Sequence, residues 1–127
     1  MKKINLTYII DDDNIFIFVL KKILEKNQSF EEVLDFKNGE KVIELLNKKN
    51  QIIPNVILLD INMPVIDGWQ FLEQIEKLPN KDQLNIFIMS SSIDANDIEK
   101  SKSFSTVKDF ISKPINNDKL IKLLESI

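Results

Sequence analysis

The stretch NVILLDINMPVIDGWQFLEQI, residues 55–75, shows most clearly how apolar and amphipathic segments alternate in this chain. After Asn55 comes a continuous apolar run over 56–59, and residues 55–59 are predicted to form a β-strand covered on both of its faces. The run ends at Asp60, and a short segment that contains a proline and a glycine follows it. Apolar residues then recur at helical spacing over about 67–77. A buried strand joined to an amphipathic helix predicts a parallel sheet.

The same alternation extends in both directions from this stretch. Further strands are predicted at 6–10, 33–36, 85–89 and 109–111, and further helices at 14–27, 39–49, 94–104 and 116–126. The strand around 33–36, in the segment EEVLDF, is the weakest of these predictions because its composition also suits a loop. Five strands alternating with five helices indicate an α/β domain with an open, doubly wound parallel sheet.

The composition excludes several classes of function. The chain has 127 residues, which suits one compact domain. It contains no cysteine and no histidine, which excludes disulfides, thiolate metal sites and a role as a phosphohistidine carrier. Its 17 basic residues are all lysine, and the formal net charge of -3 disfavours nucleic acid as a direct partner.

Nothing in the sequence predicts insertion into a membrane. No apolar run approaches the roughly 18 to 20 residues that span a bilayer. The first four residues, Met1 to Ile4, do not lead into the long apolar segment of a signal peptide. We therefore expect a cytoplasmic protein that does not bind membranes.

Polar residues follow the predicted strands at the points where the strands end. In doubly wound sheets, ligands bind outside the carboxyl ends of the strands, near the point where the strand order reverses. Carboxylate oxygens at that edge would suit Mg2+, an ammonium group would neutralise phosphoryl charge, and a carboxylate could act as a nucleophile. The residues concerned are Asp11, Asp12, Asp13, Asp60, Ser90, Ser91, Ser92 and Lys113.

Each of these residues also has an ordinary structural explanation. Asp13 or Asn14 could cap the first helix, and Asp60 could begin a turn. The serines could form a polar loop, and Lys113 could be solvated. Capping and turn formation give no reason for all of these residues to occur at one edge of the sheet. Their joint placement therefore favours a phosphoryl-transfer site.

Four segments of the chain resemble the receiver domains of two-component response regulators. They are YIIDDD at 8–13, the stretch at 55–75 with Asp60, Met63, Pro64, Asp67 and Gly68, IFIMSSS at 86–92, and DFISKP at 109–114. The segments follow one another in the order that the family has, and the resemblance extends over essentially the whole chain. The resemblance implies a flavodoxin-like fold with a five-stranded parallel sheet in the order 2-1-3-4-5 and five helices.

The resemblance also implies a phosphoacceptor and a metal site. Asp60 would accept the phosphoryl group. Mg2+ would be held by Asp11, Asp12, Asp60 and the backbone carbonyl of Asn62. Family members of this kind catalyse only their own phosphorylation and dephosphorylation, so we do not expect an enzyme acting on other substrates.

A conformational switch is implied in the same way. Ser90 and Lys113 would bind the phosphoryl group. Ser90 and Phe110 would then carry the change to the surface around the fourth helix, the fifth strand and the fifth helix. In this family the peptide bond before the matching proline is typically cis, so we expect a cis bond between Lys113 and Pro114.

Receiver domains take their phosphoryl group from a phosphohistidine, on a sensor histidine kinase or on a histidine phosphotransfer protein, and we expect such a partner here. We also expect a downstream protein target, and no output domain within 1–127. On the first helix, at about 100° per residue, the predicted core stripe is Phe16, Val19, Leu20, Ile23 and Leu24. The docking face for the kinase is then predicted to be Ile17 and Phe18, with Lys21 and Lys22 at its rim.

Two other functions compete with this one. A haloacid-dehalogenase-like phosphatase would use the Asp-x-Asp pattern within Asp11 to Asp13, but it needs a further acidic pair after the lysine. Asp118 and Glu125 follow Lys113, and neither lies at a predicted strand end. A receiver-like binding module that is never phosphorylated would be expected to lose an acid or the lysine, and this chain keeps them all.

Overall fold

The computed structural model describes residues 3–48, 52–63, 66–92 and 94–127. Strands and helices alternate along the chain as the sequence predicts. The strands are β1 (Ile4–Ile10), β2 (Phe30–Phe36), β3 (Val56–Asp60), β4 (Ile86–Ser90) and β5 (Val107–Ser112). The helices are α1 (Asn14–Lys26), α2 (Glu40–Asn47), α3 (Gly68–Ile75), α4 (Ala95–Ser101) and α5 (Asn117–Glu125), with a short 3-10 helix η1 (Lys81–Gln83) before β4.

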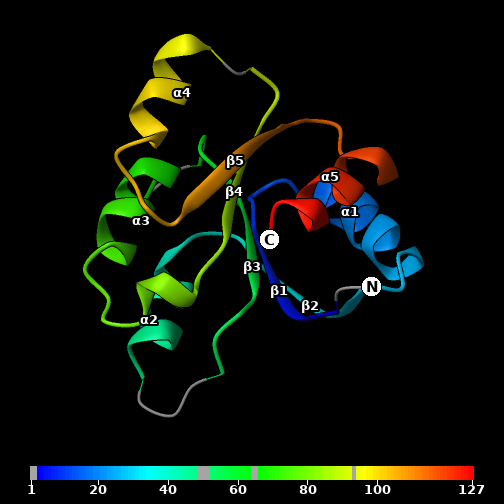
Figure 1. The fold of residues 1–127 in the computed structure, drawn as a ribbon, viewed down its shortest axis with the longest axis horizontal. Coiled ribbons are helices and arrows are strands. Elements are labelled where there is room, and N and C mark those ends of the chain that lie inside the picture. The colour runs from blue at the N-terminus through cyan, green and yellow to red at the C-terminus, as the bar shows by residue number, and fades with distance from the viewer. Residues whose placement is uncertain (1–2, 49–51, 64–65, 93) are drawn as a thin grey trace.

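The five strands form one parallel sheet in the order β2-β1-β3-β4-β5, which confirms the predicted fold. Helices α1 and α5 cover one face of the sheet, and α2, α3 and α4 lie on the other (Figure 1). All strands run in the same direction, so their carboxyl ends meet at one edge, at the top of Figure 1. The strand order reverses between β1 and β3, which is where such sheets hold their ligands.

Two apolar cores lie on the two faces of the sheet. Every residue of β3 and β4 is buried, as their continuous apolar sequences predict. The uncertain segment at 33–36 belongs to a true strand, since β2 pairs with β1 from Ile4 opposite Phe30 to Ile10 opposite Phe36. Its exposed residues explain why its sequence is less apolar than that of the central strands.

Helix boundaries differ slightly from the prediction. The helix predicted at 39–49 ends at Asn47, and residue 49 lies outside the described residues. The helix predicted at 94–104 ends at Ser101, because the hydroxyls of Ser101 and Ser103 bind the carbonyl oxygens of Ile98 and Lys100 in its last turn. Within the described ranges, no helix is long and apolar enough to cross a membrane.

The rotation of α1 about its axis corrects one prediction. Ile17, Leu20 and Leu24 form its buried face, so the helix is turned by about 60° from the predicted orientation. Val19, predicted to lie in the core, is 50% exposed, whereas Ile17, predicted to belong to the docking face, is only 4% exposed. The sequence IFIFVL at 15–20 is apolar all round the helix, so contacts with the sheet, not the pattern, select the buried side.

Candidate functional site

The structure brings Asp11, Asp60, Ser90 and Lys113 to the carboxyl edge of the sheet. Asp11 directly follows β1, Asp60 is the last residue of β3, and Ser90 is the last residue of β4. Lys113 directly follows β5, and its backbone N–H donates to the carbonyl oxygen of Ser90 at 2.9 Å. Residues that are far apart in the sequence therefore meet at the switch point of the sheet.

Three carboxylates converge at this edge. Asp11, Asp12 and Asp60 each offer an oxygen, and these oxygens all lie within 4.8 Å of one another. Asp11 and Asp60 are buried, while Asp12 is exposed at the rim. This spacing agrees with the prediction that the three carboxylates can share one ion.

Lys113 supplies a positive charge to the same cluster. Its Nζ donates to Oδ2 of Asp11 at 2.8 Å and lies 3.7 Å from Oδ2 of Asp60. The side chain is only 17% exposed, so solvent screens these contacts weakly. The Lys113–Pro114 peptide bond is cis, as predicted.

Backbone N–H groups hold the two buried carboxylates in place. The N–H of Asp13 donates to Oδ1 of Asp11 at 2.9 Å, and that of Asn62 donates to Oδ1 of Asp60 at 3.0 Å. Asp13 has a second function, because its carboxylate accepts from the N–H groups of Ile15 and Phe16 and caps α1. The third of the three consecutive aspartates, Asp13, is therefore the N-cap of α1.

Gly68 allows α3 to begin close to the end of β3. Its N–H donates to the carbonyl oxygen of Ile61 at 3.1 Å. A Cβ atom at residue 68 would lie 2.5 Å from the Cα of Ile61, a contact that only glycine avoids. The segment between Asp60 and α3 is thus anchored at Asp60, Ile61 and Asp67, which caps α3 through a capping box with Gln70. Pro64, predicted as part of this motif, lies outside the described residues.

The environment of Asp60 opposes its negative charge. Burial raises the pKa of the Asp60 carboxyl above its ordinary value, and the nearby Asp11 and Asp12 carboxylates raise it further. The hydrogen bond from Asn62 and the charge of Lys113 lower the pKa of Asp60 but do not outweigh these effects. A cation bound to the cluster would therefore favour the ionised form.

The two predicted switch residues differ in burial and in their contacts: Ser90 is buried and Phe110 is half-buried. Ser90 is buried, and its Oγ donates to the carbonyl oxygen of Ser92 at 2.9 Å and accepts from the N–H of Ser92 at 3.1 Å. Phe110 is half-buried on β5, packs against the core on the α2–α3 side and lines a groove between β5 and α5.

Comparison with known proteins assigns the family. A model of the family described as "Response regulator receiver domain" matches residues 7–125. The chain belongs to this receiver-domain family. The receiver domain is 32% identical over 120 residues to the chemotaxis protein CheY of Listeria monocytogenes, an alignment that covers 94% of this chain and 96% of that protein.

Solved structures agree with this assignment. A two-component response regulator from Cytophaga hutchinsonii has a TM-score of 0.86 and 29% identity, covering 98% of this receiver domain and 96% of that chain. A response regulator receiver protein from Dyadobacter fermentans has a TM-score of 0.83 and 30% identity, with 94% of each chain covered.

The acidic cluster fits a divalent cation by its chemistry and its charge. Carboxylate oxygens are hard ligands, which suit Mg2+ better than soft metals. Asp11, Asp12 and Asp60 carry three negative charges when ionised, and Lys113 balances one of them. The two remaining charges match those of one divalent ion.

Phe16 is a residue at the site to which the sequence assigned only a core position. The Nζ of Lys113 lies over its ring, 4.2 Å from the ring centroid. The signal that could have found it is an aromatic side chain in the first turn of the helix that follows the acidic pair.

Proposed function

We propose that this receiver domain accepts a phosphoryl group on the Asp60 carboxylate, in a Mg2+-dependent reaction, and signals through the resulting change of its surface. The donor is a phosphohistidine on a sensor kinase or on a histidine phosphotransfer protein. One observation carries the proposal: the Asp60 carboxylate lies within 4.8 Å of two further carboxylates and 3.7 Å from a lysine ammonium. The domain catalyses only its own phosphorylation and dephosphorylation.

Each residue of the site has a role in this reaction. An Oδ atom of Asp60 is the nucleophile that attacks phosphorus, and the donor nitrogen leaves. Asn62 keeps the Asp60 carboxylate oriented through its backbone N–H, and Lys113 holds a positive charge beside the oxygen that is 3.7 Å away. Asp11 fixes that lysine with a 2.8 Å hydrogen bond.

Asp11, Asp12, Asp60 and the backbone carbonyl of Asn62 would hold Mg2+. When bound, the ion supplies positive charge that offsets the clustered carboxylates and the phosphoryl oxygens. Without it, the three carboxylates would repel an anionic phosphodonor.

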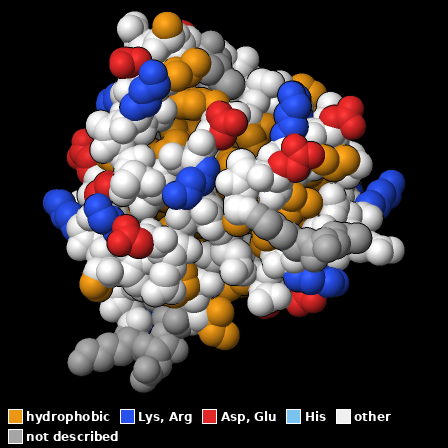
Figure 2. Space-filling model, in the orientation of Figure 1, with side chains coloured by type: hydrophobic (Ala, Val, Ile, Leu, Met, Phe, Trp, Pro, Cys, Tyr) orange, Lys and Arg blue, Asp and Glu red, His pale blue; other side chains and the backbone are white. Residues whose placement is uncertain are grey.

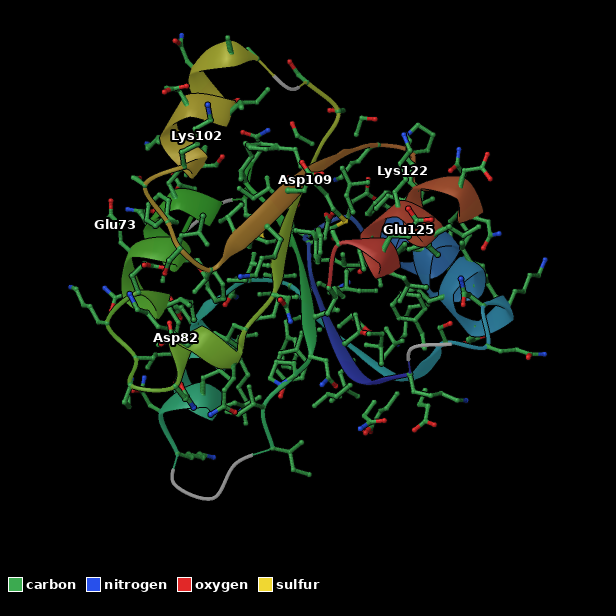
Figure 3. The ribbon with its side chains drawn as sticks, viewed as in Figure 1. Glu73, Asp82, Lys102, Asp109, Lys122 and Glu125 are labelled. Carbon is green, nitrogen blue, oxygen red and sulfur yellow. The ribbon has the colours of Figure 1, made fainter. Side chains whose placement is uncertain are left out.

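Ser90 links the site to the rest of the surface in this proposal. Its hydroxyl leaves the carbonyl oxygen of Ser92 and donates to a phosphoryl oxygen, which releases the loop before α4. Phe110 then moves, and with it the groove of about 250 Å³ that this residue lines between β5 and α5. Figure 2 shows hydrophobic side chains among charged ones on this face of the molecule. In Figure 3, Asp109 on β5 and Lys122 on α5 lie at the groove, and Lys102 lies apart from it at the end of α4.

Helix α1 provides the docking face for the phosphodonor protein. Phe18 is 63% exposed, as the proposal requires, and Ile15 and Val19 are exposed beside it. These three residues form the α1 apolar face. Ile17 is excluded from it by burial, and Lys21 is turned toward β2, where its Nζ binds Asp35 at 2.8 Å. Lys22 stays at the rim, with its Nζ 5.4 Å from the Phe18 ring centroid.

Labelling with acetyl phosphate tests the function directly. Wild-type protein with Mg2+ is expected to gain one acid-stable, base-labile phosphoryl group, measured by intact-protein mass. Asp60→Asn and removal of Mg2+ with a chelator should each abolish the adduct. A persistent adduct in Asp60→Asn would refute the assignment of the phosphoacceptor.

The same experiment separates the competing functions. A receiver-like binding module that is never phosphorylated would remain unlabelled in the presence of Mg2+. A haloacid-dehalogenase-like phosphatase would release phosphate continuously from a generic aryl phosphate ester, and Asp60→Asn would not stop the release. We expect neither result.

A further inference from the structure

Phe16 covers the lysine of the site. It is the third residue of α1 and is half-buried at the edge of the core between α1, α5 and the sheet. The Nζ of Lys113 lies over its ring at 4.2 Å from the centroid, well inside the roughly 6 Å at which cation–π attraction operates. The negative face of the aromatic ring therefore meets the positive charge that faces Asp60.

The ammonium of Lys113 contacts both the Phe16 ring and the acidic cluster. Of its three N–H groups, one donates to Asp11 at 2.8 Å, while Asp60 at 3.7 Å is beyond hydrogen-bonding distance. Among the described residues, no other side chain accepts from this ammonium. The side chain is nevertheless only 17% exposed, so little water surrounds it, and the Phe16 ring lies against the ammonium.

Local structure holds the ring where it is. The N–H of Phe16 donates to the capping carboxylate of Asp13 at 3.1 Å, which secures the first turn of α1. The ring thus comes from a capped helix terminus, while the lysine reaches the site on a long side chain that loses rotamer freedom when it is ordered. A fixed aromatic surface limits the positions that such a side chain can take.

We propose that Phe16 is a positioning residue for phosphoryl transfer: its ring holds the Lys113 ammonium toward Asp60 and keeps water from it. The inference rests on the proposed function, because it concerns the rate at which Asp60 is phosphorylated. Phe16 acts through the electron-rich face of its ring as well as through its bulk. An aliphatic residue at the same position would keep the apolar cover but lose the attraction for the ammonium.

A series of substitutions at position 16 separates these two contributions. Phe16→Leu keeps an apolar side chain without a ring. Replacing Phe16 with 4-fluoro-, 3,5-difluoro- and pentafluorophenylalanine keeps the ring shape while weakening its negative face step by step. We expect the initial rate of labelling by acetyl phosphate, at fixed Mg2+, to fall stepwise along the fluorinated series. The fall should reach about threefold to tenfold for Phe16→Leu and for the pentafluoro ring, the range of a cation–π contact.

Phe30 is the matched control. It packs in the same core cluster but begins β2, at the opposite edge of the sheet from the site. Pentafluorophenylalanine at position 30 should leave the labelling rate unchanged, which excludes a general effect of fluorinated rings in this core. In a Lys113→Met background, fluorination at position 16 should no longer change the labelling rate, because the cation has been removed.

A spectroscopic measurement tests the contact without Mg2+ or phosphodonor. The ring current of Phe16 should move the Lys113 Cε proton resonances upfield in the NMR spectrum, and Phe16→Leu should return them toward ordinary values. Equal labelling rates in wild type and in every folded variant at position 16 would overturn the inference while leaving the proposed function intact. Failure of the wild type to be labelled would instead overturn the proposed function, and the inference with it.

Discussion

At the scale of single residues, two buried threonines differ in their hydrogen bonding. Thr7 on β1 is fully buried, and its hydroxyl has no hydrogen-bond partner within the described part of the chain. Thr106, just before β5, is almost as deeply buried, but its hydroxyl donates to Oε2 of Glu76 at 2.9 Å. The threonine hydroxyl therefore lowers the stability of the folded state at residue 7 and raises it at residue 106.

The first prediction follows from this contrast. Thr7→Val should raise the free energy of unfolding by about 1 kcal/mol, because it removes a buried unpaired hydroxyl and keeps the side-chain shape. Thr106→Val is the matched control and should lower it by a similar amount or more, since it leaves the Glu76 carboxylate short of a donor. Urea unfolding at pH 7 measures both variants, and a destabilised Thr7→Val would show that the hydroxyl is satisfied in solution.

Glu76 leads to a prediction about how the free energy of unfolding depends on pH. Burial alone would raise the pKa of its carboxyl, but hydrogen bonds from Thr106, Lys81 and Ser105 outweigh that effect and lower the pKa below the ordinary value of 4.5. Because the pKa is lower in the folded state, the stabilisation is present above pH 4.5 and is lost as the pH falls through the folded-state pKa.

Glu76→Gln should therefore lower the free energy of unfolding at pH 7 by about 2 kcal/mol, the range for hydrogen bonds to a charged group. The difference between wild type and Glu76→Gln should shrink as the pH falls below 4.5 and through the folded-state pKa, because the wild-type carboxyl then becomes protonated. Urea titrations at several pH values between 3 and 7 test this. A difference that is constant over that pH range would contradict the role of the ionised carboxylate.

At the scale of elements, α1 shows how packing resolves an ambiguous helix. Six consecutive apolar residues at 15–20 leave its buried side undetermined by sequence periodicity. Ile17 and Leu20 are buried against the sheet, and the α1 apolar face of Ile15, Phe18 and Val19 is exposed to solvent. An apolar face of this kind beside the acidic cluster is suited to a protein partner.

The prediction at this scale concerns transfer from the cognate kinase. Phe18→Asp should slow that transfer by at least about tenfold, since a buried aromatic anchor contributes about 2 kcal/mol or more to an interface. Labelling by acetyl phosphate should not change, because that donor needs no docking face. Ile52→Asp is the control: Ile52 is 73% exposed and lies before β3, at the far edge of the sheet. Equal transfer rates for wild type and Phe18→Asp would remove α1 from the proposed interface.

At the scale of the whole molecule, the parallel sheet gathers like charges that oppose folding. Two carboxylates about 5 Å apart repel by about 3 kcal/mol at an effective dielectric constant near 20. Because Asp12 is exposed, solvent reduces its share of this repulsion well below that figure. If Mg2+ binds the assembled cluster and not the unfolded chain, as the proposed function requires, it should raise the melting temperature.

The last prediction compares adjacent aspartates. Asp12→Ala should stabilise the metal-free protein by about 1 kcal/mol, because it removes a like charge from the cluster. It should also abolish both the Mg2+-dependent rise in melting temperature and phosphorylation. Asp13→Ala should instead destabilise the protein by about 1 kcal/mol, because it removes the N-cap of α1. Thermal unfolding with and without Mg2+ measures both effects, and a destabilised Asp12→Ala would indicate a structural role for Asp12.

Much of this receiver domain follows from local sequence patterns. The apolar runs that become β3 and β4 predict buried strands because only a strand covered on both faces tolerates such a sequence. Acidic, serine and lysine residues stand at the strand ends, and parallel strands bring their carboxyl ends to one edge. The sequence therefore predicts that these side chains lie close together. The phosphoacceptor, metal and phosphoryl-binding roles remain proposals that labelling and substitution will test.

Other features depend on contacts between segments that are distant in the sequence. The buried side of α1, the stacking of Phe16 on Lys113 and the binding of Glu76 to the segment before β5 are of this kind. The sequence by itself determined the order of the elements and, to within about one residue, where each strand ends, because hydrophobic periodicity is a local property. Only the tertiary structure decided which side chains touch across those elements, because helix rotation and side-chain direction are set by packing against partners that local sequence does not encode.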